Sequence, residues 1–196
     1  MKNFLIKHPI CHIKDFMFWL GVGLFATFAM DMWGLILHWF DHQPLQNYAI
    51  LGRYLLTATQ SGHLIIPSIA TLPALPYESL VGWLTHITVG LIDAFIYMVI
   101  IFRVLHSKPH LLMSLVIAWA LMIMPMLIEQ PLLGMGIAAS HSTNPEVARI
   151  LTFSYHTVFG LGLFTGSVLF EQIDNLCHRK QKASKIAQII TFRTAA

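Results

Sequence analysis

Four long apolar stretches are the feature that most limits how this chain can fold. They run from Phe16 to Phe40, Ser79 to Phe102, Leu111 to Leu133 and Ile150 to Phe170. A helix of about 20 apolar residues spans the hydrocarbon core of a bilayer, because that core is about 30 Å thick and each residue rises about 1.5 Å. We therefore predict an all-α, four-helix transmembrane bundle over residues 16–170, between an N-terminal segment, 1–15, and a basic C-terminal tail, 171–196.

The composition agrees with a lipid environment. Hydrophobic residues make up 56% of the chain and charged residues only 11%, whereas soluble domains carry about 25% charged residues. Many basic residues lie beside the apolar stretches, so the net charge of +3 indicates topology rather than a nucleic-acid partner. Cys11 and Cys177, one near each end, do not have the spacing of a CxxC metal motif. Both lie in segments that we place in the reducing cytoplasm, so we do not expect a disulfide between them.

The basic residues also predict an orientation. Of the 12 lysines and arginines, all except Arg53 and Arg149 fall on one side of the predicted spans. Basic flanks are retained on the cytoplasmic side during insertion. We therefore expect both termini in the cytoplasm.

The segments between the spans carry their own signals. Residues 48–59 of the first outer loop suit a short interfacial helix, followed by a proline-rich stretch that cannot continue it. Pro125 and Pro131 should interrupt the third span. Gly162-x-x-x-Gly166 is typical of a close packing face, within the chain or between two copies of it. The tail suits either an amphipathic helix on the inner leaflet or an extension of the fourth span.

A short internal repeat suggests two similar helical hairpins. His86-x-x-x-Gly90-Leu91 in the second span matches His156-x-x-x-Gly160-Leu161 in the fourth, and the first and third spans each carry one acid in their outer half. Two hairpins of equal orientation would be related by a pseudo-twofold axis along the membrane normal. Such a short match also arises by chance, so both interpretations stay open.

Ionisable side chains inside the spans are the candidates for function. A charged group costs at least about 2.5 kcal/mol at the bilayer centre, so it usually faces the bundle interior and has a partner. Four such residues fall at similar depths on the outer side, namely Asp31, His86, Glu129 and His156. Asp93 follows His86 by seven residues, on the same helix face and deeper in the membrane.

Two interpretations of this polar layer compete. Imidazoles and carboxylates together suit a divalent metal such as zinc, iron or manganese, with His86, His156, Asp31 and Glu129 as ligands. Alternatively, the layer is a hydrogen-bonded network that holds the helices together, since no ligand motif such as H-E-x-x-H is present. Asp31, Arg53, His86 and Asp93 are the residues we expect to bind a ligand. Arg53 could instead pair with Glu78 or Glu146.

Several short motifs follow one another along the chain, and together they form a recognisable pattern. They are Asp31-Met32-Trp33, Asn47-Tyr48-Ala49 with Gly52-Arg53, Gly82-Trp83 with His86, Gln130-Pro131 with Gly134-x-Gly136-Ile137-Ala138-Ala139-Ser140, Asn144-Pro145, and His156 with Phe159-Gly160-x-Gly162. From about Gly21 to Phe170 this pattern resembles a family of predicted bacterial inner-membrane proteins classed as domain of unknown function 2938. The resemblance supports the topology and singles out Asp31, Arg53, His86 and His156, but it implies no reaction. Glu129 and Asp93 have no counterpart in the pattern.

Three functions are therefore open at this point. The first is a membrane protein that binds or transports a cation, a proton or a small polar ligand through the polar layer. The second is a membrane enzyme acting on a lipid or quinone-like substrate, with a histidine as general base, although no nucleophile motif supports it. The third is a structural or assembly subunit of a membrane complex.

Overall fold

The computed structural model describes residues 13–66 and 69–194, and it describes side chains for residues 16–66, 69–173 and 176. All regular elements in this part of the chain are helical. The long ones are α1 (Ile13–Asp41), α3 (Glu78–Met98), α4 (Leu111–Leu121) and α6 (Pro145–Thr194). Four helical stretches are long and apolar enough to cross a membrane, namely Phe16–Asp41, Glu78–Val104, Leu111–Leu132 and Pro145–Ile173. The predicted all-α bundle is thus confirmed, and the four stretches agree with the predicted spans to within a few residues at each end.

The second and third stretches are not uniform α-helices. At its C-terminal end α3 continues as a π-helical segment, η2 (Val99–Val104). After α4 the chain forms a second π-helical segment, η3 (Pro125–Glu129), and the short α5 (Gln130–Leu132). Proline lacks an amide hydrogen and its ring clashes with the preceding turn. The interruption predicted from Pro125 and Pro131 therefore lies where expected, in the form of a widened turn.

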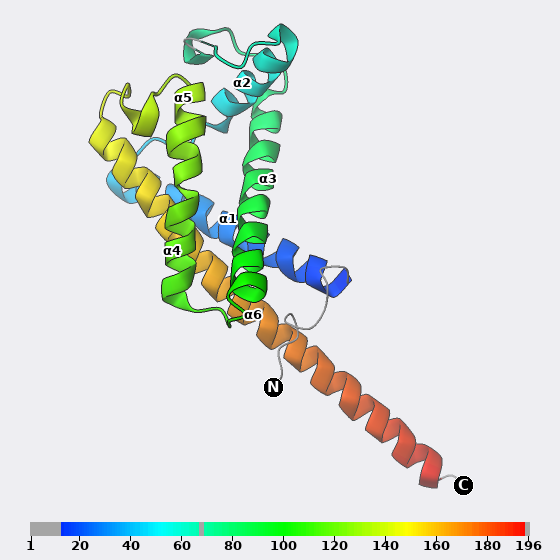
Figure 1. Ribbon diagram of the computed structural model, residues 1–196. Helices are drawn as coiled ribbons and strands as arrows, with labels where there is room; N and C mark the ends of the chain where they lie inside the picture. Colours follow the sequence, from blue (N-terminus) through cyan, green and yellow to red (C-terminus); the bar gives the residue numbers. More distant parts are fainter. Residues whose placement is uncertain (1–12, 67–68, 195–196) are drawn as a thin grey trace.

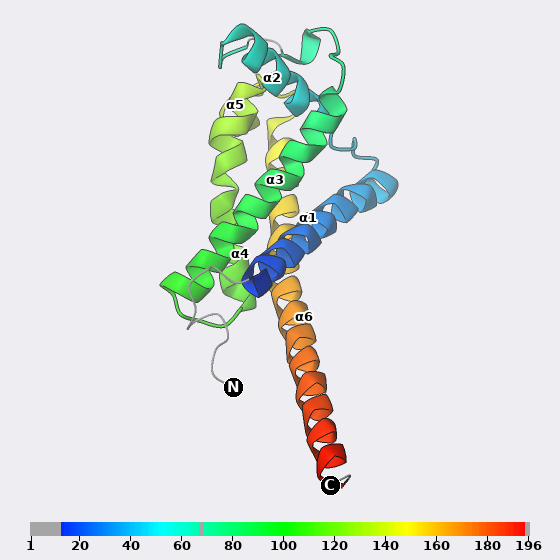
Figure 2. The same ribbon diagram turned by 90° about the vertical axis from the view of Figure 1, so that its right-hand side faces the viewer.

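The helices pack in the order α3, α1, α6, α4, since α1 contacts both α3 and α6, and α4 contacts α6. Figures 1 and 2 show α1 crossing α3 and α6 obliquely, while α6 runs the length of the bundle and extends beyond it. Residues 171–194 belong to this same helix. The tail is therefore an extension of the fourth span, which was one of its two predicted forms.

Small residues set the contacts between these helices. A side-chain carbon on Gly162 would lie 2.7 Å from the Cα atom of Ala26, and one on Gly160 would lie 2.9 Å from the Cβ atom of Ala118. Close backbone approach is the usual source of helix association in lipid, where burial of apolar surface gives no net gain. The glycines of the Gly162-x-x-x-Gly166 motif face α1 of the same chain.

Tryptophan indoles add hydrogen bonds between the same helix pairs. Trp19 donates to the carbonyl of Leu91 at 2.8 Å, which joins α1 to α3. Trp33 donates to the hydroxyl of Ser154 at 3.1 Å, which joins α1 to α6. Trp119 of α4 likewise donates to a hydroxyl on α6. Each bond satisfies a polar group that lipid could not.

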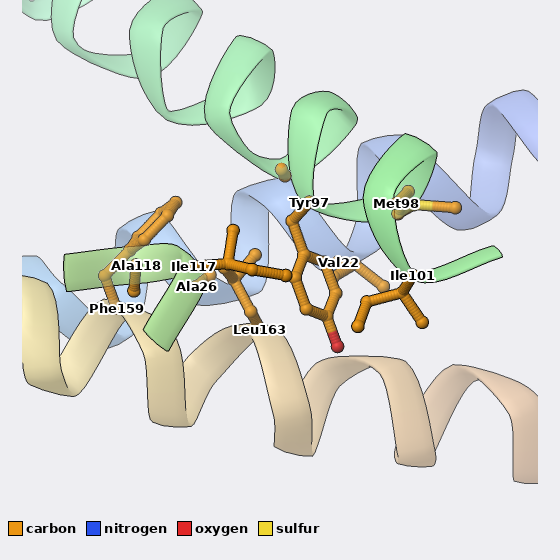
Figure 3. Close-up of a cluster of buried hydrophobic side chains, with 10 residues drawn as sticks. Val22, Ala26, Tyr97, Met98, Ile101, Ile117, Ala118, Phe159 and Leu163 are labelled. Carbon is orange, nitrogen blue, oxygen red and sulfur yellow. The ribbon is translucent and has the colours of Figure 1, made fainter. Parts of the chain in front are cut away.

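The apolar core lies between the four helices. It contains Val22 and Ala26 of α1, Ala94, Tyr97 and Met98 of α3, Ile101 of η2, Ile117 and Ala118 of α4, and Phe159 and Leu163 of α6. In Figure 3 the ring of Tyr97 reaches from the green helix, α3, toward the tan helix, α6. Large apolar side chains on the outside of the bundle stay exposed, among them Phe28, Leu84, Leu112 and Ile150. This distribution suits a surface that faces lipid.

The first outer loop forms a cap on the bundle. It contains α2 (Tyr48–Ser61), which confirms the predicted short helix, and a 3-10 turn, η1 (Ile69–Thr71). Figures 1 and 2 show α2 lying at the N-terminal end of α3. A side-chain carbon on Gly52 would overlap the carbonyl oxygen of Glu78, and one on Gly82 would overlap that of Tyr48. The backbones of α2 and α3 therefore touch directly at two glycines.

An ion pair fastens the rest of this loop. Arg53 donates two hydrogen bonds to the carboxylate of Glu78, at 2.8 and 2.9 Å, and a third to the carbonyl of Leu72 at 2.7 Å. The same carboxylate accepts from the amide of Leu75 at 2.8 Å. The Glu78 hydrogen bonds raise the pKa of the Arg53 guanidinium above its already high value. Glu78 is therefore the partner of Arg53, as one of the sequence interpretations proposed.

Replacing Arg53 by glutamine should loosen this loop without unfolding the bundle. Glutamine cannot form the bidentate hydrogen bond to Glu78, so residues 69–77 should lose their attachment to α2 and α3. We expect limited proteolysis of the detergent-purified protein to cut this loop about tenfold faster, because cleavage follows the population of the locally open state.

The matched control is Arg149→Gln, since Arg149 also lies on the predicted outer side and bonds a loop carbonyl, that of Ala138 at 2.8 Å. This variant should leave cleavage of the first loop unchanged. Equal cleavage rates in the wild type and in Arg53→Gln would show that the ion pair does not hold the loop.

Candidate functional site

The structure brings together two of the sequence-predicted residues under the cap. The imidazole Nε2 of His86, on α3, lies 2.9 Å from Oδ1 of Asp31, on α1. The two side chains are 9% and 19% exposed. A carboxylate oxygen can only accept a hydrogen bond, so the His86 nitrogen that faces it carries the proton. The pair links two of the candidate spans by a charge-assisted hydrogen bond.

Tyr48, at the start of α2, completes this cluster. Its phenol donates to the same Asp31 oxygen at 3.1 Å, and its ring stacks on the imidazole of His86 with a centroid distance of 4.0 Å. Trp83 packs edge-on against both rings. Burial, together with the nearby Asp31 charge, raises the pKa of the Tyr48 phenol. Tyr48 is therefore a neutral donor that covers the Asp31–His86 pair from the side of the cap.

Two further acids act on this cluster electrostatically. Glu129, in the π-helical η3, has a charge interaction with His86. Glu129 also has a charge interaction with Asp93, which lies about two turns further along α3 than His86. Asp31, His86, Glu129 and Asp93, all singled out in the sequence, thus belong to one electrostatic neighbourhood.

His156 has a different local arrangement. Its Nδ1 lies 2.9 Å from the backbone carbonyl of Thr152, one turn earlier on α6. A carbonyl cannot donate, so Nδ1 carries the proton when the ring is neutral and Nε2 is the acceptor. Thr152 also accepts a hydrogen bond from Gln130 at 3.3 Å.

The described side chains do not supply the ligands that the predicted metal centre would need. No three His, Cys, Asp or Glu side chains in that part of the chain lie close enough together to hold a metal ion. Asp31 and His86 form a pair, and a stable zinc or iron site takes three or more protein ligands. The pair is better described as a buried hydrogen bond than as half of a metal centre.

The sequence interpretation missed one member of the cluster. Tyr48 lies in a loop helix rather than in a span, so it was not among the intramembrane polar residues that we predicted to form the site. The available signal was Asn47 immediately before an apolar helix, since asparagine is a favoured N-cap. Its Oδ1 does accept from the amide of Ala49 at 3.2 Å. This cap sets where α2 begins and therefore places Tyr48 over His86.

Comparison with known proteins identifies a family but no activity. The model of a family described as "Protein of unknown function (DUF2938)" matches residues 20–170. No curated protein matches the chain, and neither does any solved structure. The match covers the second and third candidate spans, all but a few residues of the first and fourth, and the cap, including every residue of the cluster.

Proposed function

Because the chain belongs to the DUF2938 family, whose description assigns no activity, we propose a function from the site itself: the protein binds a proton at the Asp31–His86 pair and carries it across the membrane. On this proposal it is a multi-pass protein of a bacterial inner membrane, with both termini in the cytoplasm. The cap then faces the outside, and the pair is loaded from that side.

The single observation that carries the proposal is an excess of partly buried acid within the candidate spans. Asp31, Asp93 and Glu129 lie within the spans, and the basic residues nearest to them along these helices are Arg103, at the inner end, and Arg149, near the outer end. Arg53 of the cap is bonded to Glu78. Even the two imidazoles of the polar layer, those of His86 and His156, cannot balance three carboxylates. Bound protons or cations reduce the cost of burying the remaining charge, and chains of such groups are typical of proton relays.

The geometry of the pair favours a proton as the cation. A carboxylate and an imidazole 2.9 Å apart share one hydrogen bond across which a proton can transfer. Tyr48 donates to the same oxygen, so it holds the Asp31 carboxyl group in place against the imidazole. The described side chains offer no third ligand for a metal ion.

Proton flux into liposomes tests the proposal. The purified protein is reconstituted with a pH-sensitive dye inside, and a potassium gradient with valinomycin sets the membrane potential. Wild-type protein should change the internal pH faster than empty liposomes do. His86→Gln keeps a polar side chain but does not titrate, so it should reduce the rate by about tenfold or more.

Asp41→Asn is the matched control, because Asp41 is an exposed acid at the end of α1 and lies outside the cluster. Its rate should equal that of the wild type. A wild-type rate no higher than that of empty liposomes would overturn the proposal. If stoichiometric metal were found by elemental analysis, and were lost in His86→Gln, the site would instead be a metal centre.

A further inference from the structure

A polar stripe runs down the interior face of α3, inward from the site. His86, Gly90, Asp93 and Tyr97 follow one another at intervals of four, three and four residues, which keeps them on one face of a helix. At about 1.5 Å per residue they lie about 12, 18, 22 and 28 Å below the start of α3. The stripe therefore extends from the cluster past the middle of the candidate span Glu78–Val104.

A buried hydroxyl on α1 faces this stripe. Thr27 is 3% exposed, and its Oγ1 has no hydrogen-bond partner among the described residues. A side-chain carbon on Gly90 would overlap this oxygen, so it lies directly against the stripe between His86 and Asp93. An unpaired buried hydroxyl is unfavourable for stability. Thr27 is also one turn from Asp31 on the same face of α1.

A directed pair of hydrogen bonds continues the stripe toward the inner side. The phenol oxygen of Tyr97 lies 3.0 Å from the hydroxyl oxygen of Ser114, on α4. Ser114 donates its hydrogen to the carbonyl of His110 at 3.0 Å, and a serine has only one hydrogen to donate. Tyr97 must therefore donate to Ser114. His110 is exposed in the loop before α4, so this chain of donors ends at the inner surface.

We propose that these groups form the proton route, in which Thr27 relays between His86 and Asp93 and the Tyr97–Ser114 pair connects Asp93 to the inner surface. This inference rests on the proposed function and assigns its path. At each hydroxyl an O–H bond forms with the arriving proton while the original O–H bond breaks on the other side, so no hydroxyl gains net charge. Ser114 releases its proton to water at the inner surface, because the carbonyl of His110 accepts its hydrogen bond but does not carry the proton. Water molecules link neighbours that are more than about 3.5 Å apart.

Two nearly isosteric variants test the route in the liposome assay. Thr27→Val removes the unpaired hydroxyl and should lower proton flux by about tenfold, while the melting temperature stays equal or rises, because no hydrogen bond is lost. Tyr97→Phe keeps the buried ring and leaves Ser114 bonded to His110, and it should lower flux to a similar degree. A purely structural role for Thr27 would not produce lower flux at unchanged stability.

Thr88→Val is the matched control, since Thr88 is exposed on α3 and its hydroxyl bonds the carbonyl of Leu84. Its flux should equal that of the wild type. If the wild type conducts, depends on His86, and yet conducts equally well as Thr27→Val and Tyr97→Phe, the route is wrong and the proposed function survives. If the wild type does not conduct at all, both proposals fail.

Discussion

Replacing Asp31 by asparagine should reduce proton flux in liposomes by about 100-fold, the larger effect expected when a proton-transfer group is lost altogether. Asparagine has nearly the same shape as aspartate, and its carbonyl oxygen can accept the hydrogen bonds that Tyr48 and His86 now donate to Oδ1. It carries no charge, so a proton on His86 would lose its counter-charge. The variant therefore separates the charge of Asp31 from its role in packing.

Thermal unfolding in detergent is measured alongside flux. The melting temperature of Asp31→Asn should fall by only a few degrees, since about one hydrogen bond is weakened. Asp31→Ala, in contrast, leaves both donors without an acceptor and should be clearly less stable. Normal flux in Asp31→Asn would exclude the aspartate as a proton carrier, and a collapse in its stability would indicate a structural pair instead.

Replacing Gly82 by alanine should detach α2 from α3. The added methyl group would overlap the carbonyl oxygen of Tyr48, and the amide nitrogen of Ala49 lies only 3.3 Å from it. These are backbone atoms, which cannot rotate away as a side chain can. We expect a loss of more than about 3 kcal/mol from the docking of the cap, the upper range for overpacking.

Because Tyr48 belongs to the detached helix, the same change should also uncover His86. Reaction of His86 with diethyl pyrocarbonate, read by mass spectrometry, should become much faster than in the wild type. Gly166→Ala is the control, since its methyl group would lie 3.2 Å from the ring of Phe25, a side chain that can shift. Equal melting temperatures for the two variants would contradict the backbone contact at Gly82.

Hydropathy predicted the spans because the free energy that forces an apolar stretch to be helical in lipid is large. An unbonded backbone group costs several kcal/mol in lipid, so long apolar stretches must be helical. The same rule located Asp31, His86, Glu129 and Asp93, whose charges interact in the structure. How each helix is rotated about its axis was not predictable to the same degree. That rotation depends on contacts such as Gly162 against Ala26, and pairwise packing leaves little trace in one sequence.

The cap and the repeat show two further limits. The position of α2 was predicted, but its direct backbone contact with α3 depends on two glycines 30 residues apart, which no local pattern connects. The repeated motif has a partial counterpart in the packing, since Gly90 contacts α1 and Gly160 contacts α4, in each case the preceding span. The two histidines nevertheless differ. His86 bonds Asp31 of another helix, and His156 bonds its own helix.

The widened turn η3 makes the length of the third span as important as its composition. A π-helical turn contains one more residue than an α-helical turn, and each added residue rotates everything beyond it by about 100°. Glu129 is the last residue of this turn. A relative that lacked one residue between Pro125 and Glu129 would aim its acid at a different neighbour, even if every other position were identical. Gaps in this five-residue stretch should therefore divide the family into groups with different polar interiors.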